Sequence, residues 1–473
     1  MSNNCEEKKY KTLLSNTMIF AISTVLSKII LALLLPLYTR KLTTSEYGTA
    51  ELLTTVSQLV IPVCSCAIQD AVFRFSMGKE SNSSQVLKMG FKILWFADIL
   101  LLIVSFSFHW YKALSEWNIY FFFISIVTMY RSVLSLYVKA IGKSVVFAVD
   151  VVLYNGFLAG LNILFLTVLN LRLDGYFLAM ALANLISMIY LAFNSGILNL
   201  VKTPNDNLLL KNMLLYSAPL IINSISWGLT HVADKVMLTE MDSSDATGVY
   251  SVASKIPSLL SLITGVFSQA WTLSAIQDYQ SEKDSRFYSN VFEMTHITTL
   301  LGGLIILAFN NNLLPYLVGG DFRDAFKYSP ILLLGTVFLM YSNFYSPIYS
   351  AMMKSRQIMY SALLGAIFNL IVNALLIPMC GIMGACVATA LSYIVIVIFR
   401  MVNINRYMKI EFDLWRFLIS ILVYLFATIA SVIDIDNGYP IVSLLSVGII
   451  IVLYNSSIKK VTKLIKSRFL RRS

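Results

Sequence analysis

Charged residues are scarce in this sequence, and long polar segments are missing. Asp, Glu, Lys and Arg make up 13% of the 473 residues, whereas hydrophobic residues make up 58%. A soluble fold cannot bury that much apolar surface, because its exterior must carry polar groups. The polar segments between the apolar runs are shorter than about 20 residues, which excludes a folded extramembrane domain of the usual size of about 50 residues or more.

Cysteine and histidine are also scarce, with five and three residues respectively. Three of the cysteines lie inside apolar runs, which excludes a disulfide framework and a metal-ligand set. Gly142-Lys143-Ser144 resembles the end of a P-loop, but Tyr137 occupies the position of its first glycine and no strand precedes it. No nucleophile elbow, zinc motif or dinucleotide-binding fingerprint is present. We therefore expect no catalytic residue, no metal and no cofactor.

The sequence instead contains a succession of apolar runs that are as long as a bilayer is thick. A transmembrane helix needs roughly 20 apolar residues, and about fourteen runs of that length follow one another. The predicted spans are 12–38, 46–72, 88–108, 117–138, 145–169, 175–200, 212–234, 247–274, 290–311, 325–350, 359–379, 382–399, 414–433 and 439–456. We therefore predict an all-α integral membrane protein with about 14 transmembrane helices.

Lys and Arg are distributed unevenly between the two ends of these spans. When alternate connections are compared, 26 of the 36 Lys and Arg residues fall on the side of the N-terminus and 7 on the opposite side. Such a bias marks the cytoplasmic side of a membrane. It predicts that both termini are cytoplasmic and that the number of spans is even. The net charge of +11 therefore reflects membrane topology and does not indicate nucleic-acid binding.

The C-terminal tail, residues 458–473, is basic and amphipathic. Its apolar residues Ile458, Val461, Ile465 and Phe469 fall on one helical face. We expect this tail to lie on the anionic inner leaflet as a topology anchor, and a regulatory role is the alternative.

The two halves of the chain resemble each other weakly. The segment from Thr44 to Gly48 precedes the second span and the segment from Ser244 to Gly248 precedes the eighth, with the two glycines 200 residues apart. Gly175 opens the sixth span, as Gly381 opens the twelfth. Because six helices per unit is an even number, both units share one orientation. This predicts a parallel repeat about an axis along the membrane normal.

The repeat predicts two pseudo-symmetric six-helix lobes followed by two further helices. The expected parts are an N-lobe (1–200), a cytoplasmic linker (201–211), a C-lobe (212–408), helices 13 and 14 (409–457) and the tail (458–473). Transporters with two lobes bind their substrate between them. Pro62 and Pro257 fall in equivalent helices of the two lobes. Because proline removes a helix hydrogen bond, both are hinge candidates, and a static kink is the alternative.

Five of the charged residues inside the predicted spans are candidates for the site, because a charge near the centre of a bilayer costs roughly 2.5–3.5 kcal/mol by insertion scales. They are Lys28, Asp98, Arg131, Asp150 and Lys255. Such residues must face a partner or a wet cavity. The surplus of cations predicts a cavity that binds an anionic ligand such as a pyrophosphate, with Lys28, Arg131 and Lys255 as its substrate-binding residues.

The carboxylates in the spans leave alternatives open. One is that Lys28 or Arg131 simply pairs with Asp98, in which case the charges are structural. Another is that Asp98 or Asp150 holds a coupling proton or cation, or that Asp150 is itself a charge partner.

Two closely spaced pairs are further candidates. Asp70 and Arg74 are four residues apart at the inner end of the second span, where they form either an interfacial salt bridge or a gate. Gly156 and Gly160 have the spacing that lets membrane helices approach closely.

An ordered set of short segments carries a family resemblance. The segments are Asn16-Thr17, Pro36 to Leu42, Glu46-Tyr47-Gly48, Asp70 to Phe75, Gly319 to Phe322, Asn373 to Pro378, Gly381 to Ala385 and Ala388-Thr389. Together they resemble the bacterial polysaccharide-biosynthesis flippases, which export O-antigen and capsule repeat units, and the resemblance spans essentially the whole chain. These flippases share a superfamily with the multidrug and toxin extruders and with the lipid II flippases.

The resemblance implies a V-shaped, MATE-like transporter in the bacterial cytoplasmic membrane. Its implied cargo is an undecaprenyl-pyrophosphate-linked oligosaccharide, moved to the outer leaflet by alternating access and coupled to protons or sodium. Membrane lipids, a polysaccharide polymerase and chain-length proteins are the other implied partners. Lipid II flippases carry cavity cations on helices 1 and 8, and Lys28 and Lys255 match them by helix and approximate depth.

Two other functions remain as alternatives. An ion-coupled multidrug or small-molecule antiporter has the same fold, but the cationic surplus disfavours it because such substrates are usually cations. A membrane-embedded polymerase or ligase would carry a sizeable outer loop with catalytic residues, and every predicted outer loop here is short.

Overall fold

The computed structural model describes residues 26–27, 29–30, 32–77, 82–111, 113–197, 203–261, 267, 271, 274–275, 285–352, 354–433 and 439–459. Within these ranges every regular element is a helix. Nine of the described helices are long and apolar enough to cross a membrane, and a bent pair near residue 65 makes a tenth if it forms one span. The protein is therefore an all-α, multi-pass membrane protein.

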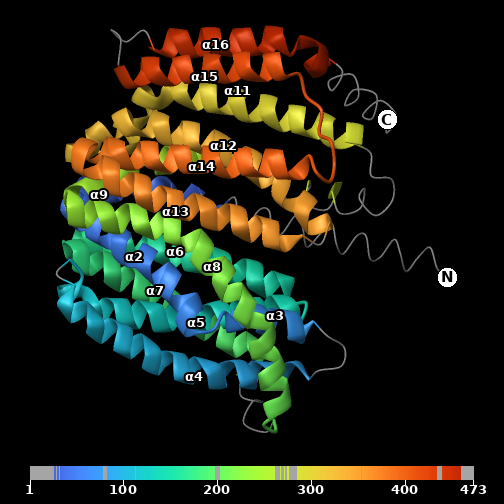
Figure 1. The fold of residues 1–473 in the computed structure, drawn as a ribbon. Helices are drawn as coiled ribbons and strands as arrows, with labels where there is room; N and C mark the ends of the chain where they lie inside the picture. The colour runs from blue at the N-terminus through green and yellow to red at the C-terminus, as the bar shows by residue number, and fades with distance from the viewer. Residues whose placement is uncertain are drawn as a thin grey trace, which may run out of the picture. The chain divides into compact units, whose positions relative to one another are not determined.

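The predicted spans correspond to helices along the described chain (Figure 1). Each predicted span after the first contains a described helix, and the first is described from residue 26 onward apart from positions 28 and 31. The main difference is α8 (Asn207–Met241), whose 35 residues extend beyond the predicted end at 234. At 1.5 Å per residue it is about 52 Å long, so its end reaches past the hydrocarbon core.

The chain divides into two compact units. The first comprises Met1–Gly248 together with Leu317–Gly320, and the second comprises Val249–Tyr316 together with Asp321–Ser473. The repeat predicts a boundary in the linker 201–211, whereas the compact units divide after Gly248. The helix that opens the second repeat, α8, therefore packs within the first unit.

The first unit is built from helices joined by short turns. A helix over residues 32–41 is followed by α2 (Thr44–Cys64), α3 (Ile68–Ser76), α4 (Ser83–Ser107), the 3₁₀ turns η1 (Phe108–Trp110) and η2 (Ser115–Trp117), α5 (Asn118–Ala140), α6 (Ser144–Ile163), the π-helical turn η3 (Leu164–Val168), α7 (Arg172–Ser195), α8 and the start of α9 (Ser244–Ala253). The pairs α5 with α7, α6 with α7, and α2 with α8 pack most extensively.

The second unit contains the rest of α9 and the helices that follow it. They are a helix over residues 255–261, α11 (Ser285–Leu317), the 3₁₀ turn η5 (Gly320–Asp324), α12 (Ala325–Ala351), α13 (Ser355–Cys380), α14 (Ile382–Ile404), α15 (Leu414–Ile433) and α16 (Tyr439–Leu453). The helices α12, α13 and α14 form a packed group, and α15 lies beside α16 (Figure 1). Trp271 stacks on Phe344 in the core of this unit, with ring centroids 5.0 Å apart.

The start and the break of the second span have identifiable local causes. Thr43 and Glu46 form a capping box, in which each side chain accepts a hydrogen bond from the other residue's backbone N–H. The span bends by 59° between α2 and α3. At the bend, Cys66 and Ala67 take left-handed backbone angles, with φ of 53° and 48°, which cost roughly 1–2 kcal/mol each for residues with a side chain. The Ala67 N–H donates to the Pro62 carbonyl oxygen at 2.8 Å.

The helices in contact with lipid are apolar on their outer faces. On α4, Trp95, Phe96 and Phe106 are 56–66% exposed, whereas Leu94 and Ala97 on the opposite face are fully buried. Large apolar side chains exposed in this number would make a soluble protein aggregate. In a bilayer they contact acyl chains, which agrees with the membrane assignment.

Candidate transport site

The start of α2 contacts the start of α9 at two glycines. A Cβ atom on Gly48 would overlap the carbonyl oxygen of Ser244, and a Cβ atom on Gly248 would overlap the carbonyl oxygen of Thr44. The Thr44 hydroxyl also donates a hydrogen bond to the Asp245 carboxylate. The contact is reciprocal, because the corresponding segments of the two repeats face each other. Only glycine allows two helix backbones to approach this closely.

A buried ion pair lies next to this glycine contact, between α2 and α8, which are side by side in Figure 1. Lys235 Nζ is 2.8 Å from Glu51 Oε2 and 2.7 Å from Thr55 Oγ1. The Tyr47 hydroxyl donates to Glu51 Oε1 at 2.9 Å. The two charged side chains are only 11% and 12% exposed. Removing one member of such a pair typically costs about 3–5 kcal/mol, because the other charge is left buried.

Arg131 is paired with Asp150, one of the two carboxylates expected as a charge partner, and its role in substrate binding stays a prediction. Its Nη2 atom lies 3.2 Å from Asp150 Oδ2, and Asp150 is fully buried. Its Nε donates to Ser187 Oγ at 2.5 Å, and its guanidinium carbon lies 3.9 Å from the ring centroid of Tyr154. Ser187 in turn donates to Asp150. The three helices α5, α6 and α7 are thus joined by a neutral polar cluster.

A second arginine joins α12, α13 and α14 in the same manner. Arg400 is 1% exposed. Its Nε donates to Ser361 Oγ at 2.9 Å, and its Nη1 donates to the Ser342 carbonyl oxygen and to Ser346 Oγ, both at 2.6 Å. In the part of the chain that the structure describes, Arg400 forms no ion pair with a carboxylate, so this cluster carries a net positive charge.

The two clusters occupy equivalent positions of the repeat. Adding 211 to the residue numbers of Arg131, Ser135 and Asp150 gives Ser342, Ser346 and Ser361, and all six residues belong to the two clusters. The same shift superposes Asn162, near the end of α6, on Asn373 in α13. Each half therefore has an arginine cluster that includes these positions, but the arginines themselves do not correspond, since Arg131 matches Ser342, and only the first half supplies a carboxylate.

The structure gives a different result for each of the other charged residues predicted inside the spans, Lys28, Lys255 and Asp98. Lys28 lies outside the described residues. Lys255 is half-buried in the helix that begins directly after the turn at Ser254, and its role in substrate binding stays a prediction. The Asp98 Oδ2 atom accepts a hydrogen bond from the Tyr130 hydroxyl at 2.9 Å, whereas its Oδ1 atom is buried and accepts no hydrogen bond among the described residues. Asp98 is therefore not the partner of Arg131.

The predicted salt bridge between Asp70 and Arg74 is not formed. Both residues belong to α3 and both are described, yet no ion pair joins them, and the Arg74 side chain is exposed. Of the two hinge candidates, Pro62 lies four residues before Cys66, the first left-handed residue at the bend of the second span. Pro257 is buried, just after the turn at Ser254 that interrupts the eighth span.

Glu51 and Lys235 are absent from the residues that the sequence predicts for the site. Glu51 is an isolated carboxylate inside the predicted span 46–72, and that isolation is a signal that identifies it. Lys235 falls one residue beyond the predicted span 212–234, and only the observed length of α8 places it inside a helix. No group of three or more His, Cys, Asp or Glu side chains in the described ranges is arranged to hold a metal ion.

Comparison with known proteins identifies related families and folds. Residues 219–375 match the MatE family. An uncharacterized membrane protein of Methanocaldococcus jannaschii, MJ1068, is 34% identical over 102 residues, which are 21% of this chain and 20% of that protein. The chain thus matches about a fifth of the length of this curated relative.

Solved structures with the same fold cover most of the chain. An inward-facing multidrug resistance MATE transporter of the MOP superfamily aligns with a TM-score of 0.67 at 13% identity, covering 80% of this chain and 95% of its own. The lipid II flippase MurJ in an inward closed conformation aligns with a TM-score of 0.66 at 14% identity, covering 94% of this chain and 100% of its own. Residues 13–273, more than half of the chain, match the family described as "Polysaccharide biosynthesis protein". The protein is therefore a member of the polysaccharide biosynthesis protein family with the fold of the MATE transporters and MurJ.

Proposed function

We propose that this protein is a flippase that moves an undecaprenyl-pyrophosphate-linked oligosaccharide across the bacterial cytoplasmic membrane for surface polysaccharide synthesis. Its membership in a polysaccharide biosynthesis family supports the assignment. The fold similarity to a lipid II flippase also supports it, because it extends over 94% of this chain, against 80% for the multidrug transporter. In this proposal both termini are cytoplasmic, as the charge bias predicts.

The reciprocal contact at Gly48 and Gly248 carries the proposal of alternating access. A gate must close tightly and must separate without leaving unpaired charges in an apolar environment. The glycines provide a close contact of small area, and water can hydrate Glu51 and Lys235 once α2 and α8 move apart. The charge bias assigns this end of α2 to the outer side. We therefore assign the contact to the outer gate.

Within the proposed cavity, Lys28 and Lys255 are the candidate ligands of the pyrophosphate. Arg131 is a weaker candidate than these two lysines, because Asp150 balances its charge. A lysine ammonium binds a phosphate as a point charge, whereas an arginine guanidinium can form bidentate hydrogen bonds with it. Two such residues on different helices would together neutralise part of a pyrophosphate that crosses the membrane. Replacing both with alanine should reduce surface polysaccharide while the protein remains in the membrane.

A cross-linking experiment tests the gate. Thr44 and Asp245, whose side chains are hydrogen-bonded, are replaced with cysteine in a chain whose five native cysteines are serine. A short thiol-reactive cross-linker should join α2 to α9 and stop polysaccharide export, and a reducible cross-linker should allow recovery after reduction. The Thr44→Cys single variant, treated identically, is the control. Unchanged export with complete cross-linking would contradict the assignment of this contact to a gate.

The second candidate function is an ion-coupled antiporter for small molecules. Asp98 favours it, because a buried carboxylate oxygen without a hydrogen bond can hold a proton or a cation. Deletion of the gene separates the two functions. The flippase predicts loss of surface polysaccharide and accumulation of the lipid-linked oligosaccharide, with unchanged drug sensitivity. The antiporter predicts increased drug sensitivity with a normal surface polysaccharide.

A further inference from the structure

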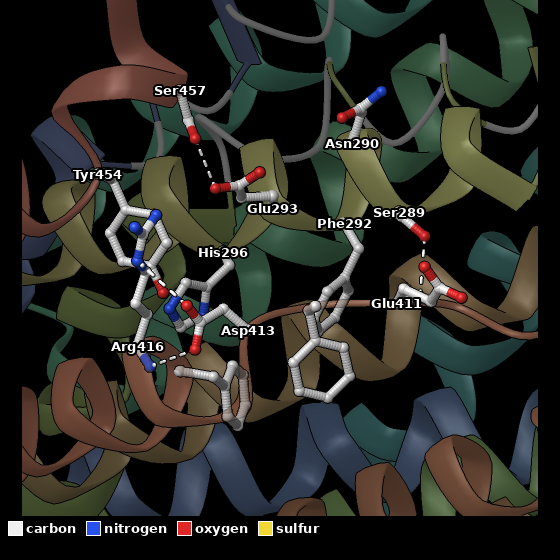
Figure 2. Close-up of a pocket in the computed structure, with 12 residues that line it drawn as sticks. Ser289, Asn290, Phe292, Glu293, His296, Glu411, Asp413, Arg416, Tyr454 and Ser457 are labelled. Carbon is white, nitrogen blue, oxygen red and sulfur yellow. Dashed lines mark hydrogen bonds and ion pairs between the residues drawn. The ribbon is translucent and has the colours of Figure 1, made fainter.

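A pocket of about 370 Å³ lies within the second unit, where the start of α11, the start of α15 and the segment after α16 come together (Figure 2). Its polar lining includes Glu293 from α11, Glu411 and Asp413 from the connection before α15, and Arg416 from the first turn of α15. Its volume falls within the range of small-molecule sites, which is roughly 300–1,000 Å³. None of these residues takes part in the proposed transport pathway.

The pocket carries an excess of negative charge. The Asp413 Oδ1 atom caps α15 by accepting hydrogen bonds from the backbone N–H groups of Trp415 and Arg416, both at 3.1 Å. Its Oδ2 atom lies 3.2 Å from Arg416 Nε, so these two charges balance. Glu293 accepts one hydrogen bond, from Ser457 Oγ at 2.6 Å, as Figure 2 shows. Among the described residues no Lys or Arg forms an ion pair with Glu293 or Glu411, so these two carboxylates make the described lining of the pocket acidic.

Aromatic rings form the apolar wall beside these carboxylates. Phe292, Phe412 and Phe417 pack against one another with centroid separations of 5.2–6.2 Å, and Tyr454 also lines the pocket. Aromatic rings present a negative face that attracts a cation. Carboxylates and rings together therefore favour a positively charged organic group over an anion or a neutral sugar.

The residues around the pocket carry positive charge, whereas the pocket itself is acidic. Its residues lie at the span ends where the sequence places most of the Lys and Arg residues, including Arg286, Arg406 and Lys409. A negative pocket within a basic surface does not follow from the positive-inside bias. The position at the ends of three spans puts the pocket at the depth of lipid headgroups.

From these observations we infer that the pocket binds a primary ammonium group, supplied by the headgroup of an aminophospholipid such as phosphatidylethanolamine. An ammonium group has three N–H donors, and Glu293 or Glu411 can each accept from it; Figure 2 draws the two carboxylates on opposite sides of Phe292. A trimethylammonium group has none and would leave both carboxylates unsatisfied. The phosphate of the same headgroup finds a cation in Arg416, whose side chain is 45% exposed. The inference is independent of the transported substrate.

The experiment measures lipid binding to the purified, full-length protein by native mass spectrometry. Short-chain phosphatidylethanolamine and short-chain phosphatidylcholine are titrated in detergent under identical conditions. The wild-type protein should bind the ethanolamine lipid at least about tenfold more tightly, and the Glu293→Gln/Glu411→Gln variant should lose this preference. The matched control is Glu116→Gln/Asp242→Asn, which removes two exposed carboxylates of the first unit, and it should keep the preference.

Thermal unfolding of each variant establishes that it is folded before its binding is compared. Equal binding of the two lipids by the wild-type protein would overturn the inference, as would an unchanged preference in the folded double variant. A third titration uses spermidine, a soluble amine, to separate the two sources of ammonium. Weak spermidine binding supports the lipid source. Spermidine that displaces the lipid in a manner dependent on Glu293 and Glu411 would overturn it in favour of a soluble ligand.

Discussion

The carboxylate of Asp150 and the hydroxyl of Ser361 occupy the same position of the two repeats, 211 residues apart, and each accepts a hydrogen bond from a buried arginine. In the first repeat the arginine is Arg131 and the cluster is neutral. In the second it is Arg400, and its described partners are hydroxyl and carbonyl oxygens. The two halves therefore both join three helices through an arginine, but the arginine comes from a different helix in each half and the net charge of the cluster differs.

Replacing Asp150 with alanine should strongly destabilise the protein. The change leaves Arg131 without an anion while its side chain is only 18% exposed, which costs about 3 kcal/mol or more. Thermal unfolding in detergent should show a clear fall in the melting temperature. The Arg131→Met/Asp150→Ala double variant should recover most of the loss, because it contains no unpaired charge.

The matched control for this prediction is Ser135→Ala. It removes a long hydrogen bond of 3.4 Å to the same carboxylate and should cost less than about 1 kcal/mol. A double variant that is as unstable as Asp150→Ala alone would show that the cluster contributes packing and not charge balance.

Introducing a carboxylate at Ser361 should convert the second cluster into the form of the first. We expect Ser361→Asp to be more stable than Ser361→Asn, which has the same size without the charge, because only aspartate can pair with Arg400. In an Arg400→Met background the order should reverse, since the new carboxylate is then buried alone. A double-mutant cycle from melting temperatures measures this coupling, and a coupling of zero would contradict the equivalence of the two clusters.

The membrane fold could be predicted from the sequence because the bilayer imposes a length on each apolar run. The contact between the repeats could also be anticipated, since Gly48 and Gly248 stand at matching positions in similar segments. The sequence offers both Asp98 and Asp150 as charge partners but cannot choose between them for Arg131, because both lie on other helices whose rotation the sequence near Arg131 does not specify.

The glycines of α6 illustrate the same limit. Gly156 and Gly160 share one helical face, and their spacing predicts a close helix contact. In the described structure a Cβ atom added at either position meets nothing within 4 Å. The spacing fixes which residues share a face, but tertiary packing decides whether another helix approaches that face.

The two glycine pairs give a direct test of the repeat contact. Gly48→Ala or Gly248→Ala places a methyl group against a backbone carbonyl, which cannot rotate away as a side chain would. Each change should force α2 and α9 apart and reduce polysaccharide export. Gly156→Ala and Gly160→Ala are the controls and should leave export unchanged, with a gain of up to about 1 kcal/mol in helix stability. Equal effects of the two pairs on export would argue against a special role of the α2–α9 contact.

Exchanging the charges of Glu51 and Lys235 tests whether their attraction closes the proposed outer gate. Glu51→Lys alone places two cations beside each other, and Lys235→Glu alone places two carboxylates beside each other, so each should favour separation of α2 from α8. In the background with cysteines at Thr44 and Asp245, both single variants should cross-link more slowly than the parent.

The double exchange restores an opposite-charge pair and should recover a large part of the cross-linking rate and of export. Its recovery will be incomplete, because Tyr47 and Thr55 are placed to bind the charges in their native positions. If the double exchange cross-links no faster than the single variants, the ion pair is not what holds this contact closed.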